Sequence, residues 1–218
     1  MHLPRFYAII DQDAGRAHGW TVPALARACL DGGARLLQVR AKTISAPELL
    51  DLCEQVAGDA AACGAALIVN DRADVARLVP GAGVHVGQDD LPPALARRVV
   101  GPGAIVGFST HTAGQVDAAI AEPISYLAVG PVFSTSTKET GYDEVGLDLV
   151  RYAARAVTAA ARDRNAPAVP IVAIGGITLG RARAVVDAGA ASVAVISDLL
   201  VTGDPAARVA AFLAELRD

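Results

Sequence analysis

A polar loop directly after an apolar run combines the residue types that bind phosphate. The run YLAV at residues 126–129 has the pattern of a buried parallel strand, and a Gly-Pro pair interrupts it. The segment that follows, 134–138, offers hydroxyls, backbone N–H groups and an ammonium, which together form a good receptor for an anion. A solvated Ser/Thr loop is the alternative. The anion site is favoured because the chain has only two lysines, Lys42 and Lys138, and each follows a predicted strand.

A second cationic group lies earlier in the chain, where an amide and two cations alternate. Gln38, Arg40 and Lys42 are two residues apart, so on an extended strand their side chains point the same way. This set suits a diphosphate, because arginine grips oxygens in a bidentate fork and lysine adds a point charge. An ion pair that covers the end of the barrel is the structural alternative.

Two carboxylates follow consecutive predicted strands next to this cationic group. Asp71 comes after the run at 66–69, and Asp90 comes after the run at 83–86. Carboxylates beside a bound diphosphate are what Mg²⁺ needs, since it takes few protein ligands and completes its octahedron with water and phosphate oxygens. Either aspartate could instead cap a helix, an alternative that is strongest for Asp90, which precedes Pro92.

Two histidines are candidates for contact with a ligand. His85 lies within a short predicted strand, where a satisfied structural histidine is an equally good interpretation. His111 follows the fifth predicted strand close to Ser109, and it could contact a ligand or act as an acid or base. The sequence leaves both roles open.

Backbone N–H groups after the last two predicted strands form a second candidate phosphate site. Gly176 and Ile177 follow the seventh strand, and Ile196 and Ser197 follow the eighth. Barrel proteins often bind a phosphomonoester at this place. The cationic group with its two carboxylates therefore suits a leaving diphosphate. The backbone N–H groups suit a phosphate that does not react. The combination predicts a transferase that joins two phosphorylated molecules with loss of pyrophosphate.

The elements that position these groups follow a regular alternation. Apolar runs and helical patterns alternate about eight times in 218 residues, and helices end in Gly-Ala or Gly-Gly just before the next strand. This predicts a single-domain (β/α)8 TIM barrel spanning residues 1–218, in which the carboxyl ends of all strands meet on one face. A doubly wound open sheet is the alternative, but its glycine fingerprint after the first strand is absent. Residues 12–20 are expected to form a loop, the fifth strand is expected at 104–106, and Thr178 is expected to cap a helix.

The composition limits the classes of function. Hydrophobic residues make up 53% of the chain, which is enough for a large core, and the net charge of -4 argues against general nucleic-acid binding. No apolar run reaches about 18 residues, so we expect a cytoplasmic protein without a membrane span. The cysteines Cys29, Cys53 and Cys63 form no metal-type cluster, and we expect them to be free thiols.

Six segments of the chain together resemble the thiamine phosphate synthase family. They occur in order over nearly the whole chain, and they are QVRAK (38–42), VNDRADVA (69–76), GVHVGQDDLP (83–92), GPVFSTSTK (130–138), AIGGI (173–177) and AVIS (194–197). The resemblance implies the condensation of an aminopyrimidine diphosphate with a thiazole phosphate. In this family the diphosphate is thought to leave first, which gives a pyrimidine cation that the thiazole nitrogen attacks.

The resemblance also implies roles for individual residues. The aminopyrimidine diphosphate would be held by Gln38, Arg40, Lys42, Asn70, Ser109 and Lys138. His85 would lie near the pyrimidine or its diphosphate, and Mg²⁺ would be bound by Asp71 and Asp90. The thiazole phosphate would be held by Thr135, Thr137, Gly176, Ile196 and Ser197. Catalytic roles would fall to Lys138, Ser109 and Arg40, and the resemblance leaves open whether the protein forms a homo-oligomer.

Two rival functions share this fold. A thiazole tautomerase is similar to the synthases and uses a histidine at the position of His111, but it tends to lose the QxRxK cations, the Asn-Asp pair and the later aspartate, all of which are present here. A non-catalytic protein that binds thiamine precursors has little need of metal-binding carboxylates. The loop 139–145 matches no pattern of the family, so its role as a lid stays open.

Overall fold

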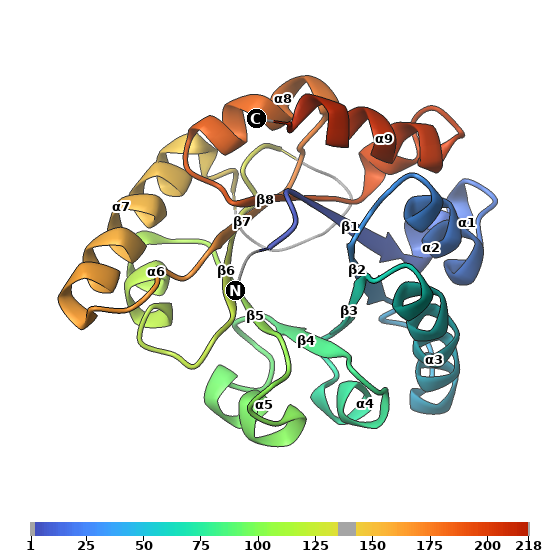
Figure 1. Ribbon diagram of the computed structural model, residues 1–218, viewed down its shortest axis with the longest axis horizontal. Coiled ribbons are helices and arrows are strands. Elements are labelled where there is room, and N and C mark those ends of the chain that lie inside the picture. Colours follow the sequence, from blue (N-terminus) through green and yellow to red (C-terminus); the bar gives the residue numbers. More distant parts are fainter. Residues whose placement is uncertain (1–2, 135–142, 218) are drawn as a thin grey trace.

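Eight parallel strands pair in sequence order, and the last closes the ring against the first (Figure 1). The computed structural model describes residues 3–134 and 143–217. The strands are β1 (Phe6–Asp11), β2 (Leu36–Arg40), β3 (Ala66–Asn70), β4 (Gly83–Val86), β5 (Val106–Thr110), β6 (Tyr126–Val129), β7 (Ile171–Ile174) and β8 (Ser192–Val195). The predicted (β/α)8 barrel is confirmed.

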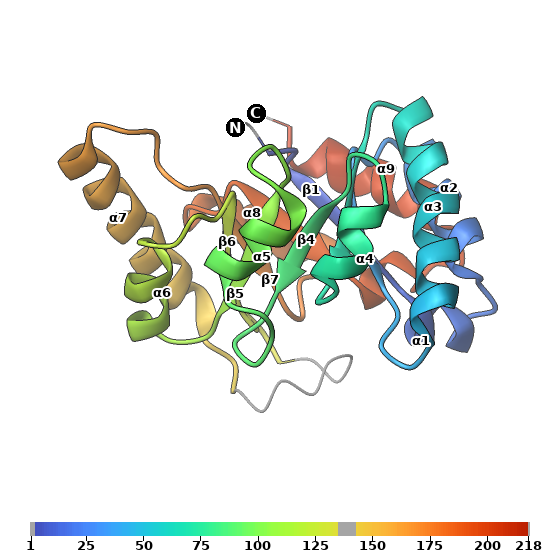
Figure 2. The same ribbon diagram turned by 90° about the horizontal axis from the view of Figure 1, so that it is seen from below.

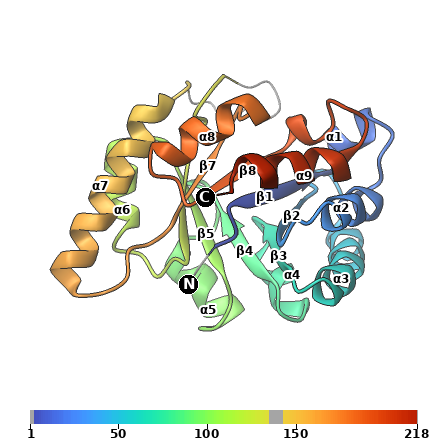
Figure 3. The same ribbon diagram turned by 45° about the horizontal axis from the view of Figure 1, so that its top comes forward.

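Helices surround the barrel on its outer side (Figure 2). They are α1 (Gln12–Ala17), α2 (Val22–Asp31), α3 (Ala46–Ala62), α4 (Ala73–Leu78), α5 (Pro93–Val100), α6 (Ala113–Ala119), α7 (Gly146–Arg164), α8 (Leu179–Asp187) and α9 (Pro205–Glu215), with the 3₁₀ turn η1 (Ser197–Leu199). Figure 3 shows α8 and α9 covering β7, β8 and β1. No helix in the described part of the chain is long and apolar enough to cross a membrane.

The strands separate two apolar cores. Outward-facing residues pack beneath the helices, as where the ring of Phe6 on β1 lies 5.0 Å from that of Phe212 on α9. Inward-facing residues such as Leu36 and Ile68 fill the centre of the barrel. The alternation of the two faces along each strand sends polar residues at the carboxyl ends into one interior space.

Local signals set several of the boundaries. Thr21 accepts a hydrogen bond from the N–H of Ala24 at the start of α2, and Ser45 and Glu48 form the complete capping box that begins α3. Gly64 has φ of 65° after α3, as expected for the residue that follows a helix.

Two expectations for local structure were wrong. Residues 12–17 form α1 and not a loop, because the carboxylate of Asp11 accepts a hydrogen bond of 2.9 Å from the N–H of Ala14 and caps a helical turn. The fifth strand runs from Val106 to Thr110 and not from 104 to 106, so Ser109 lies within the strand. The turn before β5 extends beyond residue 104, where the strand was expected to begin. Arg97 donates to carbonyl oxygens of this turn and holds it outside the strand.

Candidate active site

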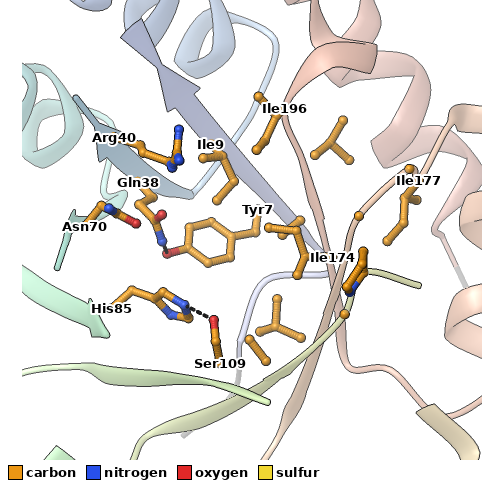
Figure 4. Close-up of a pocket in the computed structure, with 18 of the residues that line it drawn as sticks. Tyr7, Ile9, Gln38, Arg40, Asn70, His85, Ser109, Ile174, Ile177 and Ile196 are labelled. Carbon is orange, nitrogen blue, oxygen red and sulfur yellow. Dashed lines mark hydrogen bonds between the residues drawn. The ribbon is translucent and has the colours of Figure 1, made fainter. Parts of the chain in front are cut away.

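A pocket opens at the carboxyl ends of the strands and has two unlike walls (Figure 4). The polar wall comprises Gln38, Arg40, Asn70, His85 and Ser109. The isoleucine wall comprises Ile9, Ile174, Ile177 and Ile196. The first wall comes from β2 to β5, and the second comes from β1, β7 and the residues that follow β7 and β8. The pocket can therefore hold a polar group on one side and an apolar body on the other.

A chain of hydrogen bonds crosses the floor of the pocket. Gln38 Nε2 donates to Tyr7 Oη at 2.8 Å, and Tyr7 Oη lies 3.1 Å from Tyr126 Oη. His85 Nδ1 lies 2.9 Å from Tyr126 Oη, and His85 Nε2 lies 2.8 Å from Ser109 Oγ. Burial raises the pKa of both tyrosines, so both phenols stay protonated.

A glycine makes room for this chain. Gly107 on β5 is paired in register with His85 on β4 and with Tyr126 on β6. A Cβ at Gly107 would lie 2.0 Å from Cζ of Tyr126, so no larger residue fits beneath the phenol ring. The rings of His85 and Tyr126 stack across the glycine with centroids 5.6 Å apart.

Arg40 lines the pocket and also forms the kind of ion pair that was the structural alternative for its sequence pattern. Its side chain faces the pocket, and it also forms an ion pair with Asp11, its register partner on β1. The two side chains are 14% and 4% exposed, so the pair lies largely out of water. Within the described residues, Arg40 Nε has no hydrogen-bond partner. A buried donor without a partner is uncommon in proteins, and it marks Arg40 as a residue of interest in this pocket.

Lys42, Asp71 and Asp90 follow β2, β3 and β4 at the same end of the barrel, but they do not line the pocket described above. Lys42 Nζ lies 3.1 Å from Asp71 Oδ2. Burial, and after it the neighbouring Asp90 carboxylate, raises the pKa of Asp71, while Lys42 acts in the opposite direction.

The helix-capping alternative for the two aspartates is wrong. The cap positions of α4 and α5 are Arg72 and Pro92, and neither forms a side-chain capping bond. Asp90 Oδ2 instead accepts a hydrogen bond of 2.8 Å from the N–H of Gly87 and closes a turn. Asp71 has φ of 62°, a left-handed conformation that is uncommon for a residue with a side chain.

These carboxylates have the chemistry that a divalent cation requires. Asp71 and Asp90 lie close enough for their charges to oppose each other, and the Lys42 ammonium already stands beside one of them. Among residues 3–134 and 143–217 no group of three or more metal-binding side chains gathers. Mg²⁺ fits such a pair, since water and phosphate oxygens can complete its coordination.

The opposite corner of the pocket presents backbone donors. Gly176 has φ of 61°, and a Cβ there would lie 2.5 Å from the carbonyl oxygen of Ser134. In the part of the chain that the structure describes, the N–H groups of Gly176, Ile177 and Ser197 donate no hydrogen bond. Three N–H groups beside the pocket that donate to none of the described residues can receive the oxygens of a phosphate.

The cap of α8 differs from the expectation. Thr178 occupies the N-cap position but forms no side-chain capping bond. The N–H of Leu179 donates instead to Asp198 Oδ2 at 3.2 Å, and Arg208 binds the same oxygen through two nitrogens at 2.6 and 2.9 Å. The charge of the Asp198 carboxylate is thus balanced by Arg208 close to Gly176, Ile177 and Ser197.

Comparison with known proteins assigns the chain to a family. Residues 6–199 match the family model described as thiamine monophosphate synthase. The chain belongs to the thiamine monophosphate synthase family. The matched residues include all eight strands of the barrel and the residues that line the pocket.

Relatives of known name cover nearly the full chain. It is 45% identical over 215 residues to a thiamine-phosphate synthase of Koribacter versatilis, covering 98% of this chain and 96% of the relative. It is 41% identical over 213 residues to a thiamine-phosphate synthase of Acidothermus cellulolyticus, covering 97% and 94%. The solved thiamine phosphate pyrophosphorylase of Pyrococcus furiosus superposes with a TM-score of 0.82 at 26% identity, covering 97% of this chain and 94% of that one.

His111 lies at the edge of the same pocket in this member of the thiamine monophosphate synthase family. Its Nδ1 contacts the carbonyl oxygen of Gly130, and its backbone N–H donates to Gln115 Oε1 at 2.7 Å. Because a carbonyl oxygen can only accept, the proton of a neutral His111 is on Nδ1.

The structure brings eight of the predicted residues to the pocket: Gln38, Arg40, Asn70, His85, Ser109, Gly176, Ile196 and Ser197. The predicted Thr135, Thr137 and Lys138 lie outside the described residues, as does most of the loop 139–145. Sequence reasoning missed Tyr7 and Tyr126, because both lie within apolar runs that predict buried strands. Aromatic residues make up only 4% of the chain, so a tyrosine within the first and within the sixth predicted strand was the available signal of a polar contact inside the barrel.

Proposed function

We propose that this protein is a thiamine phosphate synthase. It joins 4-amino-2-methyl-5-hydroxymethylpyrimidine diphosphate to 4-methyl-5-(2-phosphoethyl)thiazole and releases pyrophosphate. The observation that carries the proposal is one pocket with a polar wall on one side and, on the other, N–H groups that donate to none of the described residues. Lys42 and Asp71 form a charged pair at the same end of the barrel. The relatives named thiamine-phosphate synthase, which match along nearly the whole chain, support it.

The polar wall and its rim receive the pyrimidine diphosphate in this proposal. Arg40 is held by Asp11 and lines the pocket, and its guanidinium is the proposed donor to a diphosphate oxygen. Lys42 adds charge at the rim, and the amides of Gln38 and Asn70 face the heterocycle. Lys138 is placed in the same site by the sequence pattern alone.

Asp71 and Asp90 are the proposed ligands of Mg²⁺. When bound, Mg²⁺ supplies positive charge to the oxygens of the leaving diphosphate. The residues of the chain prepare the site: Gly87 fixes the carboxylate of Asp90 through its N–H, and Lys42 balances the charge of Asp71.

The isoleucine wall and the N–H corner receive the thiazole phosphate. The N–H groups of Gly176, Ile177 and Ser197 face the phosphate, which keeps its charge throughout the reaction. Ile196 and the other members of the wall cover the thiazole ring and exclude water. Thr135 and Thr137 belong to the same site by sequence pattern.

The reaction then needs charge stabilisation more than proton transfer. The bond between the pyrimidine methylene carbon and the diphosphate oxygen breaks, and its electron pair leaves with the oxygen. Arg40 and Lys138 stabilise the charge that develops there. The lone pair of the thiazole nitrogen forms the new carbon–nitrogen bond, and no proton has to be removed. Exclusion of water by the isoleucine wall protects the pyrimidine cation from hydrolysis.

We also propose that the enzyme works in the cytoplasm. Cys29, Cys53 and Cys63 are all free thiols, which suits a reducing compartment.

The test is an assay of pyrophosphate release and thiamine phosphate formation with both substrates, with and without Mg²⁺. The proposal expects products only when both substrates and the metal are present, and it expects Lys138→Ala to lose turnover by about two orders of magnitude or more. Isomerisation of the thiazole without pyrophosphate would indicate a tautomerase instead. Tight binding of either substrate without any product would indicate a binding protein.

A further inference from the structure

Two buried tyrosines connect the amide of Gln38 to the imidazole of His85. We propose that Tyr7 and Tyr126 are positioning residues that hold His85 as its Nε2–H tautomer, so that the Ser109 hydroxyl donates its proton into the pocket. The consequence for catalysis depends on the proposed function, whereas the tautomer itself does not.

The four hydrogen bonds of the chain leave little freedom for their protons. Tyr7, Tyr126, Gln38 and Ser109 are at most 5% exposed, and His85 is 9% exposed. A phenol has one proton to donate, and a neutral imidazole has one donor nitrogen and one acceptor nitrogen. Since a buried donor without an acceptor is costly, the protons must be arranged in one direction along the chain.

The amide of Gln38 sets that direction. Its Nε2 can only donate, so Tyr7 Oη accepts there and gives its own proton to Tyr126 Oη. Tyr126 then gives its proton to Nδ1 of His85. The remaining imidazole proton is therefore on Nε2, where it is donated to Oγ of Ser109. The raised pKa of both tyrosines supports this arrangement, because each phenol keeps the proton that it donates.

The direction of the chain determines what the polar wall offers to a ligand. Ser109 Oγ accepts from His85, so its own proton is free to be donated into the pocket. One of the two amide protons of Gln38 is given to Tyr7 Oη, and the amide oxygen can accept a hydrogen bond from a ligand. A donor and an acceptor on one wall suit a nitrogen heterocycle that carries an amino group. The reverse direction would present the opposite pattern.

The packing around the chain shows that it is built into the barrel. Tyr126 stacks on His85 and meets Tyr7 edge to face, with ring centroids 6.0 Å apart in the second pair. Gly107 provides the space that Tyr126 occupies. The phenols therefore have one available position, and the hydroxyl of Tyr126 is directed at Nδ1 of His85.

The tautomer can be measured directly by two-bond ¹H–¹⁵N correlation spectra of protein labelled with ¹⁵N-histidine. The chain has four histidines, and a His85→Gln sample assigns the signal of His85. In the wild-type protein without substrates we expect the Nε2–H pattern. Tyr126→Phe removes the proton given to Nδ1 and should convert the signal to a mixture of tautomers. Tyr7→Phe should give a smaller change in the same direction.

Tyr152→Phe is the matched control. Tyr152 is a partly buried residue on α7 whose hydroxyl donates to Asp117 at 2.8 Å, and it does not line the pocket. Its loss should leave the His85 signal unchanged. In the synthase assay, Tyr126→Phe should lower kcat by about tenfold with a smaller change in KM, as loss of a partner that orients a functional histidine does.

An Nδ1–H pattern in the wild-type protein would overturn the proposal, as would a Tyr126→Phe spectrum identical to that of the wild type. The wild-type spectrum alone decides the first question, so the test survives if Tyr126→Phe does not fold. A protein with the Nε2–H pattern but without synthase activity would refute only the proposed function.

Discussion

The ammonium of Lys42 lies 3.1 Å from the carboxylate of Asp71, although the two residues follow different strands of the barrel. Burial raises the pKa of Asp71, and the carboxylate of Asp90, which follows the next strand, raises it further. A cation and two anions that follow three consecutive strands thus meet at the carboxyl end of the barrel. Charges gathered in this way are expected where a metal-bound diphosphate is held.

The metal proposal predicts that Asp71→Asn and Asp90→Asn each weaken the response to Mg²⁺. Each change removes one of two carboxylate ligands, so the Mg²⁺ concentration for half-maximal turnover should rise by about tenfold or more. Asp74→Asn is the matched control, because Asp74 pairs with Arg72 on the surface. Equal metal titrations for Asp71→Asn and Asp74→Asn would remove Asp71 from the metal site.

The Arg40–Asp11 pair should contribute to stability and turnover in separable ways. Arg40→Met leaves the carboxylate of Asp11, which is 4% exposed, without its partner and should cost about 3–5 kcal/mol in the free energy of unfolding. It should also lower kcat by about two orders of magnitude, because a donor to the leaving group is lost.

The double variant Asp11→Asn/Arg40→Met separates these effects. Asparagine is neutral and can still cap α1, so urea unfolding should show most of the stability restored while turnover stays low. A double variant that regains activity would show that Arg40 acts only as a structural partner of Asp11.

Gly107 should tolerate no side chain. The new methyl group of Gly107→Ala would lie 2.0 Å from Tyr126, so we expect a loss of about 3 kcal/mol, the upper range for overpacking, together with disturbance of the His85 signal. Gly58→Ala, in the middle of α3 with nothing within 4 Å, should stabilise by up to about 1 kcal/mol. Urea unfolding of the two variants tests the contrast, which equal stabilities would contradict.

The buried thiols should make stability fall in alkaline solution. Burial raises the pKa of Cys29 and Cys53 from 9.0 to about 12, so above pH 9 the unfolded chain releases protons that the folded chain retains. Each thiol should therefore lower the free energy of unfolding by up to about 1.4 kcal/mol per pH unit between pH 9 and 12. Urea unfolding at pH 8, 9 and 10 should show a shallower decline for Cys29→Ala/Cys53→Ala, and parallel declines would contradict the assignment.

The parts of the site that follow from strand periodicity could be predicted from the sequence. Gln38 and Arg40 are two residues apart on β2, so once the strand is recognised both must face the interior. Asp71 and Asp90 follow consecutive strands, and a parallel barrel places such residues at one end.

The remaining features depend on contacts that no local pattern contains. Asp11 meets Arg40 because of the register between β1 and β2. Tyr7 and Tyr126 are 119 residues apart, and only closure of the barrel brings their hydroxyls together. Both tyrosines lie among apolar residues in the sequence, and such a run predicts a buried strand. It does not indicate that a side chain within it forms a hydrogen bond across the barrel.

The central claim is that one pocket releases a diphosphate from one substrate while it keeps the phosphate of the other. A ³¹P NMR time course of both substrates with the protein and Mg²⁺ follows all of these phosphorus atoms in a single sample. We predict that the diphosphate ester signals are replaced by pyrophosphate in step with a shifted phosphomonoester signal from thiamine phosphate. Unchanged spectra, or release of inorganic phosphate from the thiazole substrate, would contradict the account.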